Sequence, residues 1–483
     1  MAHAGNRTFC LRRWLVTSYG NALEGCPRGA FFRPSAGDNP GMAAMQREEG
    51  ELETRLERVM GELDRLVNWE RRDRTADMGR SLAPVRDLLK RMGQPQESLR
   101  VVHVAGTKGK GSVASLVAAG LSAAGVKCGC YSSPHVERVT ERVRVDGEEV
   151  CEEQLARALE FALEARARSI EEETSASAST WFDLFTSAAF QVFADLGCDW
   201  VALECGLGGR LDSTNVADGD VCVLTNVDLE HTSVLGDTLQ AIAEEKAAIL
   251  PEGGVLVVGR GEEETALTAV AKATAAAQEG SVRFVEERAG STFKEHNVCV
   301  ARAALEEVEA RGGPAAAALL DQAVISSASL PARAERFAIG GRAVVLEGAH
   351  VASSVTGLLD ELAPEEPFGS PCAVVLALGR EKDARAVLKA LRGHADRVHC
   401  TTSHGGPLAT GEELAQLGRE LGIDARDAGS AREALQAALS GDSSWVLVLG
   451  SFYLAGELRP LLLELDQDKC SPSSQTSCSP TPS

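Results

Sequence analysis

A glycine-rich loop, set between an apolar run and a helical stretch, constrains the fold of this chain most. Residues 101–105 have the composition of a buried strand, and residues 112–124 are rich in alanine, leucine and valine, which favours a helix. In such a unit, N–H groups of glycine-rich backbone close on phosphate oxygens, while a lysine and a hydroxyl reach the phosphates and Mg²⁺. The spacing departs from the strict Walker pattern, because Gly111 separates Lys110 from Ser112. We prefer a phosphate site to a plain surface turn, and expect it to comprise Gly106, Thr107, Lys108, Gly109, Lys110, Gly111 and Ser112.

Further short apolar runs alternate with helical stretches along the rest of the chain. Those at 200–203, 220–225 and 255–258 are apolar without alternation, which is typical of strands covered on both faces in a parallel sheet. We therefore expect an α/β fold: a P-loop-type, doubly wound and mainly parallel sheet domain over residues 48–310. A second series of apolar runs predicts a smaller Rossmann-like α/β domain over residues 311–465.

The charge of the chain limits the kinds of partner that it can bind. A formal net charge of −21 argues against a general nucleic-acid or anionic-membrane surface, because such surfaces need clustered lysine and arginine. No run approaches the roughly 20 apolar residues of a membrane-spanning helix. The 13 cysteines lack the paired spacing of a zinc site or a disulfide framework. We expect a soluble protein with reduced thiols and no nucleic-acid or membrane partner.

The two ends differ from the middle in composition. Residues 1–47 contain several arginines and few acids, which predicts a transit peptide or a disordered leader, although Met42 and Met45 offer alternative starts. The expected compartment is therefore mitochondrial or cytoplasmic. Residues 466–483 are rich in serine, proline and threonine and predict a disordered tail.

Two polar groups follow apolar runs and suit a charged ligand. Ser133, Pro134 and His135 precede Arg142; a serine hydroxyl can bind a hard cation, and an arginine can clamp a carboxylate. Alone, this segment is as consistent with a plain loop. Glu204 ends the run at 200–203, at the edge where parallel sheets bind ligands, and predicts a ligand of phosphate-bound Mg²⁺.

In their order, the motifs resemble those of the folylpolyglutamate synthase and dihydrofolate synthase family, relatives of the cell-wall Mur ligases. The resemblance covers roughly residues 75–465 and rests on HVAGTKGKGS, SSPH, ERVRVDG, ECGLGGRLDSTN, DLEHTSVLGDT, IAEEKAAI and GSFYLAGE. It implies ATP-dependent ligation of L-glutamate to a pteroate or folate carboxylate, such as dihydropteroate, through an acyl phosphate. ATP and Mg²⁺ are the implied cofactors, and the family implies a monomer.

The resemblance also implies roles for single residues. Lys110, Lys246, His231 and Arg333 correspond to catalytic positions, and Lys246 to a lysine that is carbamylated in the family. Ser112, Ser133, Glu204 and His231 correspond to the metal ligands. Besides the glycine-rich loop, ATP would contact Asn297, Arg333, Glu347 and His350, while the substrate would contact Ser133, Pro134, His135 and Arg142.

Some positions depart from the family pattern and keep alternatives open. Phe293, Ala332, Glu347 and Val351 differ from the usual residues, and the interval between Lys246 and Asn297 is short. A nucleotide-binding relative with weak catalysis is one alternative. A Mur-type peptide ligase is another, although little chain precedes the loop to form its extra domain. The run GGRLD favours dihydropteroate over tetrahydrofolate as the substrate without deciding between them.

Overall fold

The computed structural model describes residues 54–68, 81–259, 266–286, 291–404 and 406–467. These segments belong to one compact unit that begins at Thr54. The predicted leader, 1–47, lies outside the described residues, as does the predicted tail apart from its first two residues, which still belong to the last helix. Within the described segments, no helix is both long and apolar enough to cross a bilayer.

Over the described residues, the first sheet has eight strands in the order β4-β3-β2-β5-β1-β6-β7-β8. The neighbours in the series β2-β5-β1-β6-β7-β8 pair in parallel. At one edge, β3 pairs antiparallel with β2, and β4 pairs antiparallel with β3. This arrangement confirms the predicted mainly parallel sheet. The strands are β1 (Arg100–Ala105), β2 (Cys128–Tyr131), β3 (Val143–Val145), β4 (Glu148–Glu149), β5 (Trp200–Glu204), β6 (Val221–Leu224), β7 (Val255–Val258) and β8 (Ser281–Phe284).

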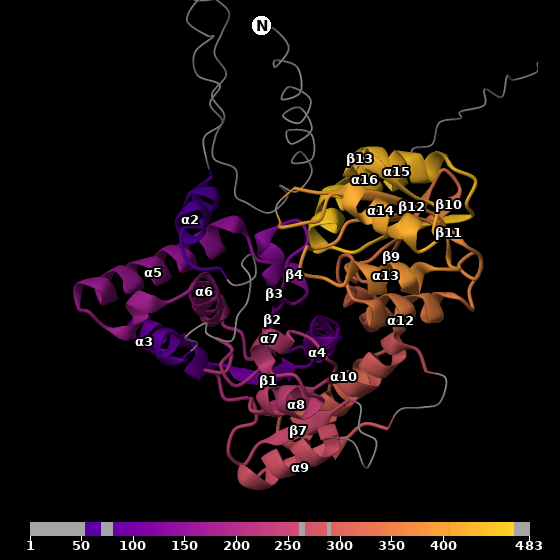
Figure 1. Cartoon of the computed structure of the whole chain (residues 1–483). Helices are drawn as coiled ribbons and strands as arrows, with labels where there is room; N and C mark the ends of the chain where they lie inside the picture. Colours follow the sequence, from indigo (N-terminus) through magenta and orange to yellow (C-terminus); the bar gives the residue numbers. More distant parts are fainter. Residues whose placement is uncertain (1–53, 69–80, 260–265, 287–290, 405, 468–483) are drawn as a thin grey trace, which may run out of the picture. The chain divides into compact units, whose positions relative to one another are not determined.

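Helices cover both faces of this sheet, which explains why its central strands are continuously apolar (Figure 1). One face packs against α4 (Lys110–Ala123), α10 (Phe293–Ala310) and α11 (Gln322–Ser327). Residues 316–328, which follow the expected domain boundary at 310, still belong to this core. The core on the other face includes residues of α6 (Trp181–Asp195), α8 (Leu239–Ala247) and α9 (Ala266–Ala277). Beyond α6, α5 (Glu152–Glu171) packs on α6, α3 (Ala83–Arg91) packs on both, and α2 (Arg55–Leu63) packs on α5. The short helices are α7 (Thr232–Leu235), η1 (Pro95–Ser98), η2 (Val139–Arg142), η3 (Ser175–Ala178) and η4 (Ala317–Leu319).

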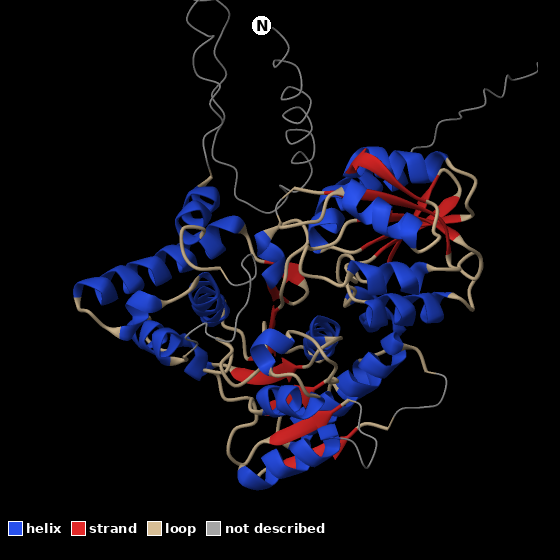
Figure 2. Ribbon diagram, viewed as in Figure 1, coloured by secondary structure: helices blue, strands red, loops and turns tan. Residues whose placement is uncertain are grey.

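The second sheet, again over the described residues, has six strands in the order β13-β12-β11-β14-β10-β9, with β9 as its antiparallel edge. Helices α12 (Ala352–Leu362), α13 (Ala384–Leu391) and α14 (Gly411–Glu420) pack on one face, and α15 (Ala431–Ser440) and α16 (Phe452–Gln467) on the other (Figure 2). The predicted smaller Rossmann-like α/β layer is confirmed. Its strands are β9 (Glu335–Ile339), β10 (Arg342–Leu346), β11 (Cys372–Leu376), β12 (Ala395–Thr402), β13 (Ala425–Ser430) and β14 (Trp445–Leu449).

The register of the first sheet places three strand ends together. Strand β1 pairs with β5 as far as Val104 opposite Glu204, and with β6 as far as Ala105 opposite Leu224. The segments that follow these strands therefore meet at one edge, the edge at which parallel α/β sheets bind ligands.

Candidate active site

The glycine-rich loop is held in shape by the two residues that follow β6. The N–H of Thr107 donates to the Asn226 carbonyl at 3.0 Å, and the N–H of Lys108 donates to the Asn226 side-chain oxygen at 2.9 Å. In return, the Thr225 hydroxyl and the Asn226 amide donate to the Lys108 carbonyl at 2.6 and 3.1 Å. Since α4 begins at Lys110, the loop leads directly into a helix N-terminus, which favours bound anions.

Gly106 is a position at which this loop tolerates no side chain. Its φ of +151° lies in a region that L-residues rarely adopt, and a Cβ there would lie 1.8 Å from the Thr225 hydroxyl oxygen. Gly106→Ala is therefore expected to displace the loop and to weaken ATP binding about tenfold or more, which corresponds to about 1.4 kcal/mol. Calorimetric titration with ATP measures this loss.

Gly357→Ala is the matched control for that variant. Gly357 lies in α12, and a Cβ there would meet no atom within 4 Å. We expect the control to bind ATP like the wild type. Equal ATP affinities for the two alanine variants would contradict the assignment of the loop to phosphate binding.

A carboxylate and two serines form the corner expected to hold a metal. The carboxylate of Glu204 accepts the N–H of Ser133 at 2.9 Å, and a Cβ on Gly111 would lie 3.0 Å from it, so Glu204 abuts the first turn of α4, where Ser112 lies. Burial raises the pKa of Glu204, against the opposing effect of Lys110. Carboxylate and hydroxyl oxygens are ligands that Mg²⁺ prefers. No three His, Cys, Asp or Glu side chains of the described residues cluster as metal ligands, so a cation at Glu204 would need hydroxyls, water or phosphate among its further ligands.

Lys246 is buried beside the same loop. Its amine donates to the Gly106 carbonyl at 2.7 Å, across the gap between α8 and the end of β1. Burial, and then the positive charge of Lys110, lowers the pKa of Lys246 to about 7. A substantial fraction of this amine is therefore neutral near pH 7, whereas an exposed lysine is almost fully charged.

Glu230 joins basic groups from both sheets. Its carboxylate lies 3.6 Å from Nε2 of His231 and 4.0 Å from Nε2 of His350, which follows β10. Burial raises the pKa of Glu230, but His231 and Lys110 outweigh that effect and hold it below its ordinary value. The structure thus brings the predicted residues His231, His350, Lys110 and Lys246 to one carboxylate.

Arg142, which was predicted to bind a substrate carboxylate, is buried in the protein interior. Its side chain is 1% exposed, stands over the Trp181 ring at 5.0 Å, and donates through Nε to Nδ1 of His135 at 2.8 Å. The neighbouring arginine of the motif, Arg144, lies on β3 and lines a pocket instead.

Arg333 is presented by a strained turn. The residues on either side, Ala332 and Ala334, adopt φ values of 50° and 49°, which are unfavourable for alanine. The N–H of Ala332 donates to Glu335 at 3.0 Å, and that of Ala334 donates to Glu347 at 2.7 Å. Two carboxylates thus hold the backbone that aims Arg333, whose guanidinium stacks on the Phe452 ring at 4.3 Å.

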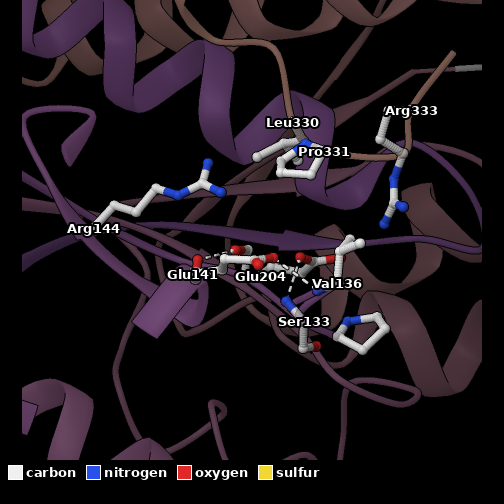
Figure 3. Close-up of a pocket in the computed structure, with 10 residues that line it drawn as sticks. Ser133, Val136, Glu141, Arg144, Glu204, Leu330, Pro331 and Arg333 are labelled. Atoms are coloured by element: carbon white, nitrogen blue, oxygen red, sulfur yellow. Dashed lines mark hydrogen bonds between the residues drawn. The ribbon is translucent and has the colours of Figure 1, made fainter. Parts of the chain in front are cut away.

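Three of these residues, Ser133, Glu204 and Arg333, line a small pocket that opens to solvent (Figure 3). Its walls come from the Ser133 segment, from the end of β5 and from the turn that carries Arg333. The full lining is Ser132, Ser133, Pro134, Val136, Glu141, Arg144, Glu204, Leu330, Pro331 and Arg333. Asn297 lies on the other side of the loop, where its side-chain oxygen would be 2.5 Å from a Cβ on Gly109.

Arg459, on α16, connects two walls of this pocket. It pairs with Glu335, which holds the turn beside Arg333, at 2.8 Å and with Glu137, which follows Val136 in the opposite wall. Replacing Arg459 by glutamine leaves both carboxylates unpaired in partly buried positions. We expect the free energy of unfolding to fall by about 2–3 kcal/mol, measured by urea denaturation.

Arg385→Gln is the control for that loss. Arg385 pairs with Glu420 at 3.0 Å, but both side chains are about half exposed. Exposed pairs contribute little, so we expect a change below about 0.5 kcal/mol. If the two variants lost equal stability, Arg459 would be an ordinary surface arginine.

Comparison with known proteins gives the relatives of this chain. Residues 332–452 match the model of the Mur ligase glutamate ligase domain. The Escherichia coli dihydrofolate synthase/folylpolyglutamate synthase is 32% identical over 410 residues, which cover 80% of this chain and 92% of that protein. The chain belongs to the folylpolyglutamate synthase/dihydrofolate synthase family.

Solved structures of this family share the fold. The structure of E. coli FolC in complex with DHPP and ADP has a TM-score of 0.71 and 26% identity, covering 85% of this chain and 98% of that one. A bifunctional folylpolyglutamate synthase/dihydrofolate synthase with Mn, AMPPNP and L-glutamate bound has a TM-score of 0.69 and 25% identity, covering 84% and 98%. The architecture of two α/β sheets is therefore that of the family.

Several residues of this folylpolyglutamate synthase/dihydrofolate synthase site were not predicted from the sequence. Thr225 ends the apolar run at 220–225 and Asn226 follows it, so the rule that found Glu204 at the end of its run also applies to them. Glu230 precedes the predicted His231 in the same motif. Arg459 carries no local signal, because its partners are distant in the sequence.

Proposed function

We propose that this chain is an ATP-dependent ligase that joins L-glutamate to a pteroate or folate carboxylate through an acyl phosphate. One observation carries the proposal: Glu204 abuts both the start of α4, where phosphates would bind, and Ser133 in the pocket wall. A carboxylate shared by the phosphate loop and the pocket suits phosphoryl transfer from ATP to a ligand in that pocket. The ADP, DHPP and L-glutamate held by the related structures support the same reading.

The reaction follows from these groups in two steps. An oxygen of the acceptor carboxylate attacks the γ-phosphorus, and the bond to ADP breaks while Lys110 and the loop N–H groups stabilise the phosphoryl charge. The amine of glutamate, after losing a proton to solvent, attacks the acyl carbon; the bond to phosphate breaks and the nitrogen loses its second proton to the departing phosphate or to solvent, which leaves an amide. Arg333, held by its strained turn, faces the same pocket and would stabilise charge on the transferred group.

A divalent cation fits this site, and we propose Mg²⁺. Ser112, Ser133, Glu204 and His231 would hold it, and when bound it neutralises phosphate charge. We also propose that Lys246 is carbamylated: a neutral amine adds carbon dioxide and loses a proton, and the lowered pKa supplies that neutral form. The new carboxylate would lie beside the phosphate loop.

Dihydropteroate is the acceptor that we favour, and the full chain tests this with both candidates. Phosphate release from ATP is measured with and without L-glutamate, in the presence of dihydropteroate or tetrahydrofolate. Turnover with dihydropteroate alone identifies a dihydrofolate synthase, and turnover with both identifies a bifunctional enzyme. A folded protein that binds ATP but releases no phosphate with either acceptor would contradict the proposed function. We further propose a monomer, which light scattering of the active protein measures.

A further inference from the structure

Two guanidinium groups enter the pocket from opposite sides. Figure 3 shows Arg144 on one side and Arg333 on the other, with the carboxylates of Glu141 and Glu204 between them. Arg144 comes from β3, opposite Cys130 of β2, whereas Arg333 comes from the turn before β9. The pocket therefore has cationic groups supplied by distant parts of the chain.

The two carboxylates of the pocket are already engaged by backbone. Glu141 accepts the N–H groups of Val136, Glu137 and Arg138 at 2.7–2.8 Å, and Glu204 accepts that of Ser133 at 2.9 Å. These bonds orient Glu141 toward its own loop and Glu204 toward the loop that follows β2. The carboxylates of the pocket wall are thus structural or metal-directed.

Among the described residues, Arg144 has no Asp or Glu partner. Its guanidinium forms no ion pair or hydrogen bond with another residue that the structure describes, although Arg138 in the same segment pairs with Glu152 at 3.5 Å. Arg333 likewise forms no ion pair within the described segments; it stacks on Phe452 and donates weakly to the adjacent Ala332 carbonyl at 3.4 Å. A partly buried arginine without a carboxylate is costly unless a ligand supplies one.

We propose that Arg144 binds a carboxylate of the entering L-glutamate and thereby selects an acidic amino acid as the nucleophile. This inference rests on the proposed function. The planar fork of a guanidinium matches a carboxylate with two parallel N–H···O bonds, and an amino acid with two carboxylates suits a pocket with two opposed arginines. Arg142, by contrast, packs on Trp181 and serves to position His135.

The test compares Arg144→Gln with the wild type in glutamate-dependent phosphate release. We expect the KM for L-glutamate to rise about 10- to 100-fold, with the KM for ATP unchanged and kcat largely retained at saturating glutamate. The rise should be equal with dihydropteroate and with tetrahydrofolate as acceptor, and Arg144→Lys should recover part of it. Arg138→Gln, which removes an exposed arginine of the same segment, should leave every constant near the wild-type value.

Three results would overturn the inference. An unchanged KM for glutamate in folded Arg144→Gln would remove Arg144 from the glutamate site. A rise seen with tetrahydrofolate alone would assign Arg144 to the glutamate tail of the acceptor, which dihydropteroate lacks. Absence of wild-type turnover would overturn the proposed function, and this inference with it, whereas failure of the inference alone leaves an active wild type.

Discussion

Glu204→Gln is expected to lower kcat by about 10²–10³-fold while leaving the protein at least as stable as the wild type near neutral pH. Activity falls because glutamine keeps the bond from the Ser133 N–H but no longer offers a charged oxygen to the cation. Stability is retained because burial makes the ionised carboxylate unfavourable. Steady-state phosphate release and thermal unfolding at several pH values measure the two effects.

The pH dependence of this stability difference has a defined sign. Since the folded-state pKa of Glu204 lies above its ordinary value of 4.5, the ionised carboxylate destabilises the wild type increasingly as pH rises through the folded pKa. Below pH 4.5 the glutamine variant should lose its relative advantage. Glu62→Gln, at an exposed position of α2, should change neither activity nor stability. A less stable, fully active Glu204→Gln protein would contradict the assignment.

Lys246→Met is expected to lower activity by about 10²-fold or more, because it removes both the amine beside the phosphate loop and the proposed carbamate. If the carbamate forms, the wild type should lose activity in buffer depleted of carbon dioxide and regain it with bicarbonate. Lys246→Arg, which keeps the charge but cannot form this carbamate, should be inactive under both conditions. Wild-type activity that does not depend on carbon dioxide would contradict the carbamate proposal.

The lowered pKa of Lys246 also predicts how stability varies with pH in carbon dioxide-free buffer. The folded state holds this proton only below a pH of about 7, while the unfolded chain holds it up to about 10.5. The unfolded state therefore binds more protons across this window, so Lys246 makes the wild type progressively less stable as pH falls from 10.5 to 7. Relative to the wild type, Lys246→Met should gain stability over the same fall. A difference in unfolding free energy that is constant over this range would contradict the burial of a neutral lysine.

The sequence predicted most interior strands but few of the edge strands, and it missed the buried interior strand β2, a run of four residues that includes a glycine. Strands such as β1 and β5 are buried on both faces and stand out as uninterrupted apolar runs. The edge strands β9 and β13 were missed because much of each is exposed, and their polar residues resemble loops. Tertiary pairing, rather than local composition, makes these segments strands.

Some residues of the candidate site could be predicted from the sequence, and others could not. Residues that follow buried strands, such as Glu204, could be predicted because parallel topology places strand ends at one edge. The burial of Arg142 could not be predicted, because it depends on its packing over the Trp181 ring, which is distant in the sequence, whereas Arg144 lines the pocket. Arg459 depends on the approach of α16 to the loop at 136–137, where a Cβ on Gly456 would lie 2.1 Å from the Val136 carbonyl. No local pattern encodes that contact.

Transfer of oxygen from the acceptor to phosphate tests the central claim most directly. The acceptor carboxylate is labelled with oxygen-18, the wild-type chain turns over with ATP and L-glutamate, and the released phosphate is examined by mass spectrometry. An acyl-phosphate ligase must place one labelled oxygen in each phosphate, because the carboxylate oxygen that attacks the γ-phosphorus leaves with it. Product formed together with unlabelled phosphate would contradict the mechanism.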